Sequence, residues 1–445
     1  MNIGDRIKVE VIDINHDGLG VAKLDGMAVF IPNTIDGEEV LCEIKKINKN
    51  YLEAKLIEVI KPSKYRVRPI CPIFYKCGGC DIQHMDYKKQ LEYKISMAQS
   101  TLRRIGHIDK KIDEIIGMDN PYYYRNKIQV PFTSKKGKTT CGYYMKKSHE
   151  IVPIDQCFIQ PKYDTEIVNF IKNLANEYKV NGYNEETREG VIRHVLIRSN
   201  YLDEVMIVLV TNTEKIYHVD EMITKIVNRY PNVISIIQNI NKKNTNVILG
   251  EKSNVLYGKS RIVDKLNDLY FDISHYSFFQ INREQTEKLY NKAIEFLNPK
   301  KDDIVIDGYC GVGTISLNIA KYVKHVYGIE IVEDAIVDAR NNAKLNNITN
   351  VDFIVGKVEE KIFDLLDNQI SGIVIDPPRK GVEANVLAGI MKSKINKIVY
   401  VSCDVATLAR DLEILSREYE IKNISLVDMF CQTTNVETVV CLERK

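Results

Sequence analysis

The first sixty residues alternate apolar and polar positions in short runs, among them IKVEVIDI, GMAVFIPN and YLEAKLIEVI. Turns that contain Gly and Asp separate these runs, as in HDGLG and IDGE. Alternation with a period of two is typical of strands with one buried face, and short turns join such strands into hairpins. The pattern therefore predicts a small antiparallel β-barrel over residues 1–60. Barrels of this size often bind nucleic acid on one face.

The pattern becomes mixed between residues 61 and 275. Short strand-like runs such as NKIQVPF, VIRHVLIRSN and EVMIVLVTN occur together with a few stretches of helical length, including 86–105 and 163–178. Strands and helices without a regular alternation indicate a mixed arrangement rather than a wound sheet. We therefore predict a central α+β domain over residues 61–275.

A regular rhythm begins near residue 300. The apolar runs DIVIDGY, HVYGIEI, VDFIVGK, GIVIDPP and KIVYVSC alternate with segments of helical length. This order predicts a doubly wound parallel sheet with helices on both faces, a Rossmann-like domain over residues 276–445. Two last runs, ISLVDMF and VETVVCLER, predict an antiparallel hairpin at the edge of that sheet. The fold class expected for the whole chain is multi-domain α/β.

Composition agrees with this division. At 445 residues the chain is long enough for two or three cores, and its 44% hydrophobic and 27% charged residues are typical of a soluble globular protein. Neither the stretch MNIGDRIKVE nor any later segment is apolar enough for a signal peptide or a membrane span, so we expect a cytoplasmic location. The ten cysteines are then better explained by metal or catalytic roles than by disulfides.

The net charge of +2 hides an asymmetry along the chain. Residues 300–445 carry 18 Lys and Arg against 22 Asp and Glu, so the positive excess lies in the earlier part. It is concentrated at 43–68, with eight basic residues against three acidic ones, and at 121–150, with seven against one. Tyrosines lie among these basic residues, which suits a nucleic-acid backbone with bases stacked on rings. A solvated lysine-rich surface explains the charge equally well.

The first strand of the wound domain is followed by a glycine-containing turn at residues 307–314. Glycines at such a turn let backbone amides come close to a ligand. The next strand ends at Glu330, nineteen residues after Gly311, where a carboxylate can accept hydrogen bonds from both ribose hydroxyls of an adenosyl group. The glycines do not match the GxGxxG pattern of dinucleotide-binding folds, and a structural turn without a ligand is the alternative.

The fourth strand of this domain ends in Asp376-Pro377-Pro378-Arg379. Open α/β sheets bind ligands outside the carboxyl ends of their strands, so we expect this tetrapeptide to face the same crevice. The prolines restrict the backbone and hold Asp376 and Arg379 at the mouth of the pocket. The alternative is an Asp–Arg pair that only stabilises the turn.

The fifth strand ends in Val401-Ser402-Cys403-Asp404, ahead of a helix whose N-terminus would favour a thiolate. A lone cysteine is most often a small core residue. Beside a nucleotide pocket, however, a thiolate suits pyrimidine chemistry: its addition at carbon 6 gives carbon 5 the electron density to attack an electrophilic methyl group. A general base must then remove the proton from carbon 5. Glu437, in the last strand, is the candidate, with an ordinary surface glutamate as the alternative.

Four strings of the sequence resemble those of a known family. VSCD, DPPR, FFQIN (residues 278–282) and DMF…T..VE (residues 428–437) are similar to those of the bacterial uracil-5 RNA methyltransferases, which include 23S rRNA uridine enzymes and tRNA T-loop enzymes. Residues 1–60 resemble the TRAM domain, the RNA-binding barrel of that family. The resemblance covers the whole chain, and it implies methyl transfer from S-adenosylmethionine (SAM) to carbon 5 of a uridine in RNA.

The resemblance also implies residue roles. Cys403 matches the nucleophile, Glu437 matches the base that removes the proton, and Arg379 matches a position near the target base. The positions that contact SAM are matched by Gln280, Tyr309, Glu330 and Asp376.

The chain departs from the family pattern at four positions. Cys431 and Asn435 stand where the family string DMFPxTxHVE has Pro and His. Tyr309 replaces a phenylalanine, and His275 replaces a proline. The changes around residues 431–435 leave open how Glu437 is oriented.

Cys71, Cys77 and Cys80 lie within ten residues, with Gly78 and Gly79 between the last two. Thiolates at this spacing suit either zinc or an iron–sulfur cluster, and a fourth ligand must come from Cys141 or Cys157. The C-x5-CGGC string resembles the [4Fe–4S] loop of the rRNA branch, and this resemblance implies a [4Fe–4S] cluster with Cys157 as the fourth ligand. We expect the cluster to hold the central domain and to shape the RNA surface.

The resemblance favours 23S rRNA as the substrate, because the tRNA T-loop enzymes are generally shorter and lack both the barrel and the cysteine loop. Some members of this architecture act on tRNA, which is therefore the alternative. A non-catalytic RNA-binding protein would not need Cys403 and Glu437, and an amino-group methyltransferase would not need a thiol. We expect the protein to act as a monomer.

Overall fold

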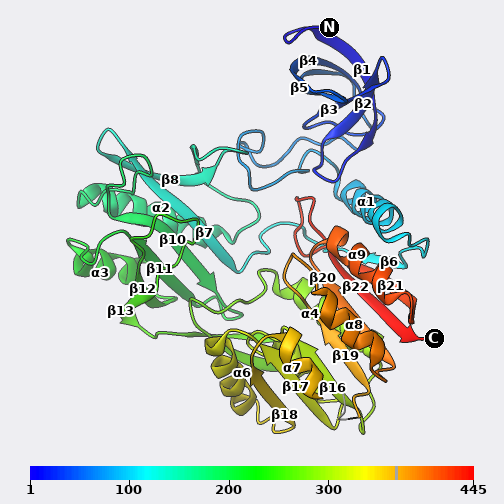
Figure 1. Cartoon of the computed structure of the whole chain (residues 1–445). Helices are drawn as coiled ribbons and strands as arrows, with labels where there is room; N and C mark the ends of the chain where they lie inside the picture. Colours follow the sequence, from blue (N-terminus) through cyan, green and yellow to red (C-terminus); the bar gives the residue numbers. More distant parts are fainter. Residues whose placement is uncertain (366–368) are drawn as a thin grey trace.

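The N-terminal segment forms a closed barrel at one end of the computed structural model, which describes residues 1–365 and 369–445 (Figure 1). Its strands are β1 (Arg6–Ile14), β2 (Gly20–Leu24), β3 (Met27–Ile31), β4 (Glu39–Ile47) and β5 (Tyr51–Lys61). Val11, Ala22 and Leu52 are fully buried inside it, because alternate residues of a strand point to opposite faces. The predicted barrel is confirmed, but it is not wholly antiparallel, because β3 and β5 pair in parallel.

A buried ion pair fastens the barrel to the segment that follows it. The fully buried Glu38 carboxylate accepts hydrogen bonds from Arg66 Nη2 at 2.7 Å and from the Ser63 amide at 3.2 Å. A guanidinium and a carboxylate that share two bonds fix each other's orientation. The exit of the chain from the barrel is therefore held in place.

The middle of the chain forms a seven-stranded sheet of order β13-β12-β11-β10-β7-β8-β9. Its strands are β7 (Lys127–Lys135), β8 (Lys138–Tyr144), β9 (Ile151–Pro153), β10 (Ile192–Ser199), β11 (Val205–Thr211), β12 (Val233–Ile240) and β13 (Lys252–Gly258). Helices α2 (Lys162–Glu177) and α3 (Val219–Arg229) share one buried apolar cluster with this sheet. This agrees with the mixed α+β pattern of the sequence.

The wound sheet has the strand order β18-β17-β16-β19-β20-β22-β21-β6. Seven of its strands are β16 (Ile304–Gly308), β17 (His325–Glu330), β18 (Val351–Val355), β19 (Gly372–Ile375), β20 (Lys397–Ser402), β21 (Tyr419–Val427) and β22 (Glu437–Arg444). The helices around it are α4 (Arg283–Leu297), α5 (Thr314–Ala320), α6 (Glu333–Leu345), α7 (Val358–Leu365), α8 (Ala384–Lys392) and α9 (Val405–Leu415). Neighbouring residues Val305 and Ile306 belong to two different buried clusters, one on each face. The Rossmann-like prediction is confirmed.

Two segments from before residue 120 complete this sheet. α1 (Tyr87–Gly106) begins at Asp86, whose carboxylate accepts from the Lys88 amide, and it packs against α9. β6 (Glu114–Ile116) pairs in parallel with β21 and forms the edge of the sheet. The predicted β21–β22 hairpin is antiparallel as expected, but its placement at the edge was wrong, because β6 covers β21.

The hairpin of β14 (Ile262–Leu266) and β15 (Leu269–Ile273) leads into the segment before α4. Asn282 caps α4 by accepting from the Gln285 amide, and its Nδ2 donates to the Met429 carbonyl at 3.1 Å. One side chain thus joins the FFQIN string to the DMF string. None of the helices in residues 1–365 and 369–445 has the length and apolar character needed to span a membrane.

Candidate active site

Strands β16, β17, β19 and β20 bring their carboxyl ends to one edge of the wound sheet. Gly308, in β16, pairs with Ile329 on one side and with Ile375 on the other. Glu330 and Asp376 directly follow Ile329 and Ile375, so their backbones lie at the same height along the sheet. This is the edge at which open α/β sheets bind ligands.

The turn after β16 is held in left-handed backbone conformations. Tyr309, Gly311 and Gly313 have φ angles of 67°, 55° and 82°. A Cβ at Gly313 would also lie 2.8 Å from the Phe353 ring, so both the conformation and the packing require glycine there. Tyr309 adopts this conformation without being glycine, which is costly in free energy and is common at ligand sites. Its hydroxyl donates to Glu359 Oε1 at 3.1 Å.

The Glu330 carboxylate is fixed by two backbone amides. Gly311 N donates to one of its oxygens at 3.2 Å, and Val332 N donates to the other at 2.9 Å. An ionised carboxylate has about four acceptor sites, so two remain for hydroxyl groups of a ligand. The position predicted for the ribose contact is therefore pre-arranged.

The segment that carries Gln280 is held by the seven-stranded sheet. Asn126 donates from its Nδ2 to the Gln280 carbonyl at 2.9 Å and from its amide to the Ile281 carbonyl at 2.8 Å. Gln280 itself is 9% exposed. The central part of the chain therefore sets the position of this predicted SAM contact.

Cys403 and Glu437 lie opposite each other at the ends of neighbouring strands. Ser402 of β20 pairs with Thr438 of the antiparallel β22. Cys403 directly follows β20 and Glu437 begins β22, and the charge of Glu437 acts on the Cys403 thiol. Opposed residues of an antiparallel ladder point to the same face, with Cβ atoms about 5 Å apart. The structure thus brings together two residues that are 34 positions apart in the sequence.

The surroundings of Cys403 and Glu437 favour the neutral form of each group. Burial, together with the charge of Asp376, raises the pKa of Glu437 to about 8, while Arg379 opposes the shift. Burial, Glu437 and Asp376 raise the pKa of Cys403 to about 11, and Arg379 again opposes. Asp376 keeps part of its surface exposed, yet burial of its carboxyl raises its pKa to about 7. These effects place Arg379, which is exposed, within electrostatic range of Glu437 and Cys403.

A second group of predicted residues lies apart from this edge. Cys71, Cys77, Cys80 and Cys157 line one cavity of about 290 Å³. Burial and the three neighbouring thiols raise the pKa of Cys80. Cys141, the other sequence candidate, lies instead in the core beneath the seven-stranded sheet. Among the described residues, no three His, Cys, Asp or Glu side chains form a group that would hold a metal ion.

Two cations line the same cysteine cavity, Arg125 and Lys127. Burial, Arg198 and Arg125 lower the pKa of Lys127 to about 8. Positive groups beside thiols favour the thiolate form, which is the form that binds iron or zinc.

Comparison with known sequences settles the family. Residues 86–445 match the family model described as tRNA (Uracil-5-)-methyltransferase, and residues 2–57 match the TRAM domain. The chain belongs to the tRNA (uracil-5-)-methyltransferase family. It is a SAM-dependent RNA methyltransferase, and the resemblance found in its sequence strings is confirmed.

Relatives of this methyltransferase match it along almost their whole length. An uncharacterized RNA methyltransferase of Clostridium tetani is 45% identical over 429 residues, covering 96% of this chain and 93% of the relative. One of Halalkalibacterium halodurans is 44% identical over 450 residues, covering 100% and 98%. Among solved structures, the tRNA (uracil-54, C5)-methyltransferase of Pyrococcus abyssi in complex with S-adenosyl-L-homocysteine superposes with a TM-score of 0.80 at 28% identity, covering 98% of this chain and 100% of that one.

The departures of this methyltransferase from the family strings are accommodated locally. Cys431 is fully buried and packs with Met118, Tyr124 and Ile159, and its sulfur lies 3.6 Å from the Tyr87 hydroxyl. Asn435, by contrast, is exposed. The Cys431 change therefore affects packing, and the Asn435 change affects a surface beside Glu437.

Sequence reasoning missed the buried polar contacts that hold the 428–436 segment. Lys94 of α1 and Asp428 are both fully buried, with Nζ and Oδ1 2.5 Å apart. Asp428 also accepts from the Tyr87 hydroxyl at 2.8 Å, and Gln90 Nε2 donates to Gln432 Oε1 at 2.9 Å. Three residues of α1 thus fix the segment that leads to Glu437. Polar residues at buried helix positions were the available signal, but the sequence does not show which partner they meet.

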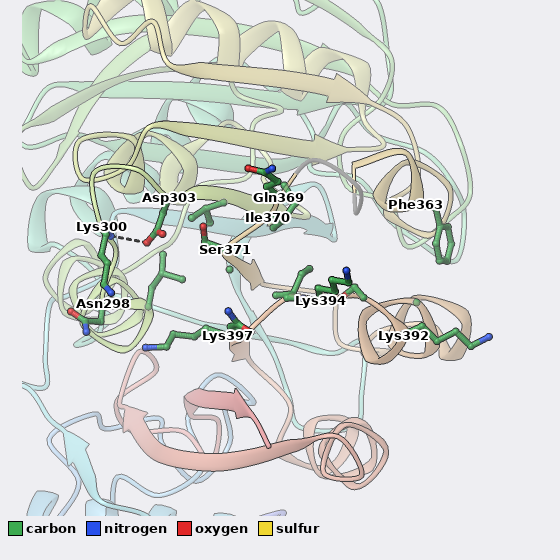
Figure 2. Close-up of a pocket in the computed structure, with 17 residues that line it drawn as sticks. Asn298, Lys300, Asp303, Phe363, Gln369, Ile370, Ser371, Lys392, Lys394 and Lys397 are labelled. Carbon is green, nitrogen blue, oxygen red and sulfur yellow. Dashed lines mark hydrogen bonds between the residues drawn. The ribbon is translucent and has the colours of Figure 1, made fainter.

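A larger cavity, about 880 Å³, lies at the opposite edge of the wound sheet (Figure 2). Its lysines are Lys300, Lys392, Lys394 and Lys397, and the Lys300 amide donates to Asp303 Oδ2 at 2.7 Å. Residues Gly372 and Lys397, which begin β19 and β20, line it. It is therefore separated from Cys403 by the length of the strands and contains none of the predicted site residues.

Proposed function

We propose that this enzyme methylates carbon 5 of a uridine in RNA through a covalent intermediate, with Cys403 as the nucleophile and Glu437 as the base. The opposition of these two residues across β20 and β22, at the ligand-binding edge of the sheet, carries the proposal. A uracil placed between them presents carbon 6 to the thiol and carbon 5 to the carboxylate.

The chemistry follows from the two side chains. Cys403 loses its proton to solvent and its sulfur forms a bond to carbon 6 as the double bond between carbons 5 and 6 opens, which moves electron density to carbon 5. SAM, when bound, would supply an electrophilic methyl group to that carbon, with S-adenosylhomocysteine as the leaving group. Glu437 then takes the proton from carbon 5, and the electrons left behind restore the ring double bond as the sulfur–carbon bond breaks. Arg379, the cation that lowers the pKa of both groups, stabilises their charged forms.

We propose that Gln280, Tyr309, Glu330 and Asp376 hold SAM. The two amide bonds that leave acceptor sites free on Glu330 support this role for the ribose. The open space beside Gly311, where a Cβ would meet nothing within 4 Å, lets a ligand approach the backbone. Tyr309 in its left-handed conformation forms the start of the same turn.

We propose further that Cys71, Cys77, Cys80 and Cys157 hold a [4Fe–4S] cluster. The residue types support this, because four thiols line one cavity and Fe–S clusters take four Cys ligands, although the described side chains do not converge into a metal-binding group. Arg125 and Lys127 would offset the negative charge of the thiolates. A single zinc ion is the alternative, and it needs the four sulfurs about 2.3 Å from one point.

For the substrate we propose 23S rRNA, on the similarity of the cysteine loop to that of the rRNA branch. The match to the archaeal tRNA enzyme makes the T-loop of tRNA the second candidate, because that enzyme is covered along its entire length and so shares the barrel region. We also propose three functional parts, at 1–60, 61–275 and 276–445, within a monomer, with α1 and β6 of the second part packed on the third.

One experiment tests the reaction and the substrate together. The protein is incubated with SAM and unmodified 23S rRNA or tRNA in separate tubes, and the nucleosides are analysed by mass spectrometry. New 5-methyluridine in rRNA is the expected result. Formation in tRNA alone would keep the chemistry and replace the substrate, and formation in neither RNA would contradict the proposed function.

A further inference from the structure

A separate cavity of about 320 Å³ borders Cys403, and its lining includes the carboxylates of Asp17 and Asp404. It is lined by residues of three parts of the chain: the barrel loop at His16 and Asp17, helix α1, and the stretches around Cys403 and Asn435. Glu437, Asp376 and Arg379 do not line it. A target uracil must contact Cys403 and Glu437 together, so this cavity is suited to something that lies next to the target.

The barrel loop is held firmly at this position. The Tyr93 hydroxyl of α1 donates to the Asn15 carbonyl at 2.8 Å, and the Asn15 side chain accepts from the Leu19 amide at 2.9 Å. Gly18 lies so close to Thr434 that a Cβ there would come within 2.8 Å of its methyl group. The RNA-binding barrel thus forms a fixed wall beside the nucleophile.

The floor of this cavity is apolar. Val405 and Val436 are 6% and 2% exposed, and Met97 of α1 is half-buried. Thr101 adds its methyl group, because its hydroxyl donates to the Met97 carbonyl at 2.8 Å. An apolar surface of this kind accepts the flat face of a nucleobase.

The rim of the cavity is polar and charged. Arg104 lies one turn after Thr101 and two turns after Met97 on the same face of α1, and it is exposed. The neighbouring Arg103 does not line the cavity and pairs with Asp109 at 3.2 Å. An exposed guanidinium beside an apolar floor is the combination that binds a phosphate next to a stacked base.

We propose that this cavity binds the nucleotide adjacent to the target uridine, with its base on the Met97–Val436 floor and its phosphate at Arg104. The proposal rests on the proposed function, since it needs the target uridine at Cys403. In this proposal the barrel, α1 and the catalytic part all contact the nucleotide next to the target. The exposed Asn435 lies at the rim of the cavity that binds this nucleotide.

The test uses a short RNA in which the wild-type enzyme forms 5-methyluridine, and versions of it that lack the base at one or the other neighbouring position. Removal of one of these bases should weaken binding to the full-length Cys403→Ala variant about tenfold, since a stacked base contributes about 1–3 kcal/mol. Met97→Ala should weaken binding of the intact RNA. It should not further weaken binding of the RNA that already lacks the stacked base. Equal effects of Met97→Ala on both RNAs would overturn the proposal.

Arg104→Gln tests the phosphate contact, with Arg103→Gln as the matched control. Arg104→Gln should lower the slope of log affinity against log salt by about 1, whereas Arg103→Gln should leave it unchanged. Circular dichroism and thermal unfolding confirm that each variant is folded. If the wild-type enzyme methylates the RNA but removal of either neighbouring base leaves the binding affinity unchanged, the proposal is contradicted. Absence of 5-methyluridine with every intact RNA would instead remove the proposed function.

Discussion

Cys403 and Glu437 occupy opposed positions one residue beyond the Ser402–Thr438 pair of the β20–β22 ladder. Glu437 begins β22 and Cys403 directly follows β20, two neighbouring strands in the interior of an eight-stranded sheet. Sites built on strands hold their geometry more closely than sites on loops. The pairing of these strands therefore restricts the positions of the proposed nucleophile and base.

Cys403→Ala should abolish formation of 5-methyluridine while leaving SAM and RNA binding within about twofold, because only the covalent step is removed. Cys441→Ala is the matched control, since Cys441 lies on β22 but near its other end. Nucleoside mass spectrometry and equilibrium binding measure the two effects. Methylation by the Cys403→Ala variant would contradict the covalent mechanism.

Glu437→Gln should accumulate an RNA–protein adduct that survives denaturation. The thiol still adds and the methyl group is still transferred, but the proton on carbon 5 has no acceptor, so the sulfur–carbon bond cannot break. Denaturing electrophoresis with labelled RNA detects the adduct. Glu443→Gln, at the far end of the same strand, should turn over normally.

The methylation rate should rise with pH through about 8, the pKa of Glu437. The carboxylate that accepts the proton forms only above this value, and a higher pH also favours the Cys403 thiolate. A rate that is flat between pH 6.5 and about 9 under single-turnover conditions would argue against Glu437 as the base.

The same pKa makes a stability prediction of opposite sign. Because the pKa of Glu437 is raised from its ordinary 4.5 to about 8, the folded protein favours the protonated form. The stability that this contributes is complete below about 4.5 and is lost as pH rises towards 8. Glu437→Gln cannot ionise, so its free energy of unfolding should fall less than that of wild type over this range. Urea unfolding at several pH values measures the difference.

Cys157→Ala should lose the iron of an anaerobically purified sample, whereas Cys141→Ala should keep about four irons per chain. Cys157 lines the shared cavity and Cys141 does not. Metal analysis and visible absorbance distinguish the two variants. A colourless wild-type protein with one zinc ion would contradict the cluster.

Lys94→Ala should lower the free energy of unfolding by about 3 kcal/mol, because it leaves the Asp428 carboxylate buried without its cation. The double variant Lys94→Met, Asp428→Leu should recover part of that loss. Arg103→Gln breaks an exposed pair and should cost less than about 0.5 kcal/mol. Equal losses from Lys94→Ala and Arg103→Gln would contradict the role of the buried pair.

The sequence predicted a strand or helix correctly where the apolar pattern of that segment alone is sufficient to distinguish the two. The strands β1 to β5 bury one face each, which gives alternating apolar and polar residues. In the wound sheet, β16, β19 and β20 bury both faces, which gives short continuous apolar runs separated by helices. The expected helices at 86–105 and 163–178 correspond to α1 and α2. Motif order also indicated Cys403 and Glu437, since strand ends of a wound sheet meet at one edge.

Long-range pairing could not be predicted in the same way. Nothing in the sequence of β6 shows that it pairs with β21 about 310 residues later, because three residues carry too little pattern to specify a partner. The contact of Lys94 with Asp428 likewise depends on where α1 docks. The wall that the barrel loop forms beside Cys403 follows from the same docking.

β22 has a further consequence for how the enzyme is made. It follows the other strands of its sheet in the sequence, yet it lies between β20 and β21. During synthesis on the ribosome, one edge of β20 and one edge of β21 therefore remain unpaired until β22 is complete. Unpaired strand edges promote aggregation. The strand that closes this gap begins with Glu437. A chain that stops short of it would lack the proposed base and would also leave one edge of β20 and one edge of β21 unpaired, so loss of activity and a tendency to aggregate would come from the same missing strand.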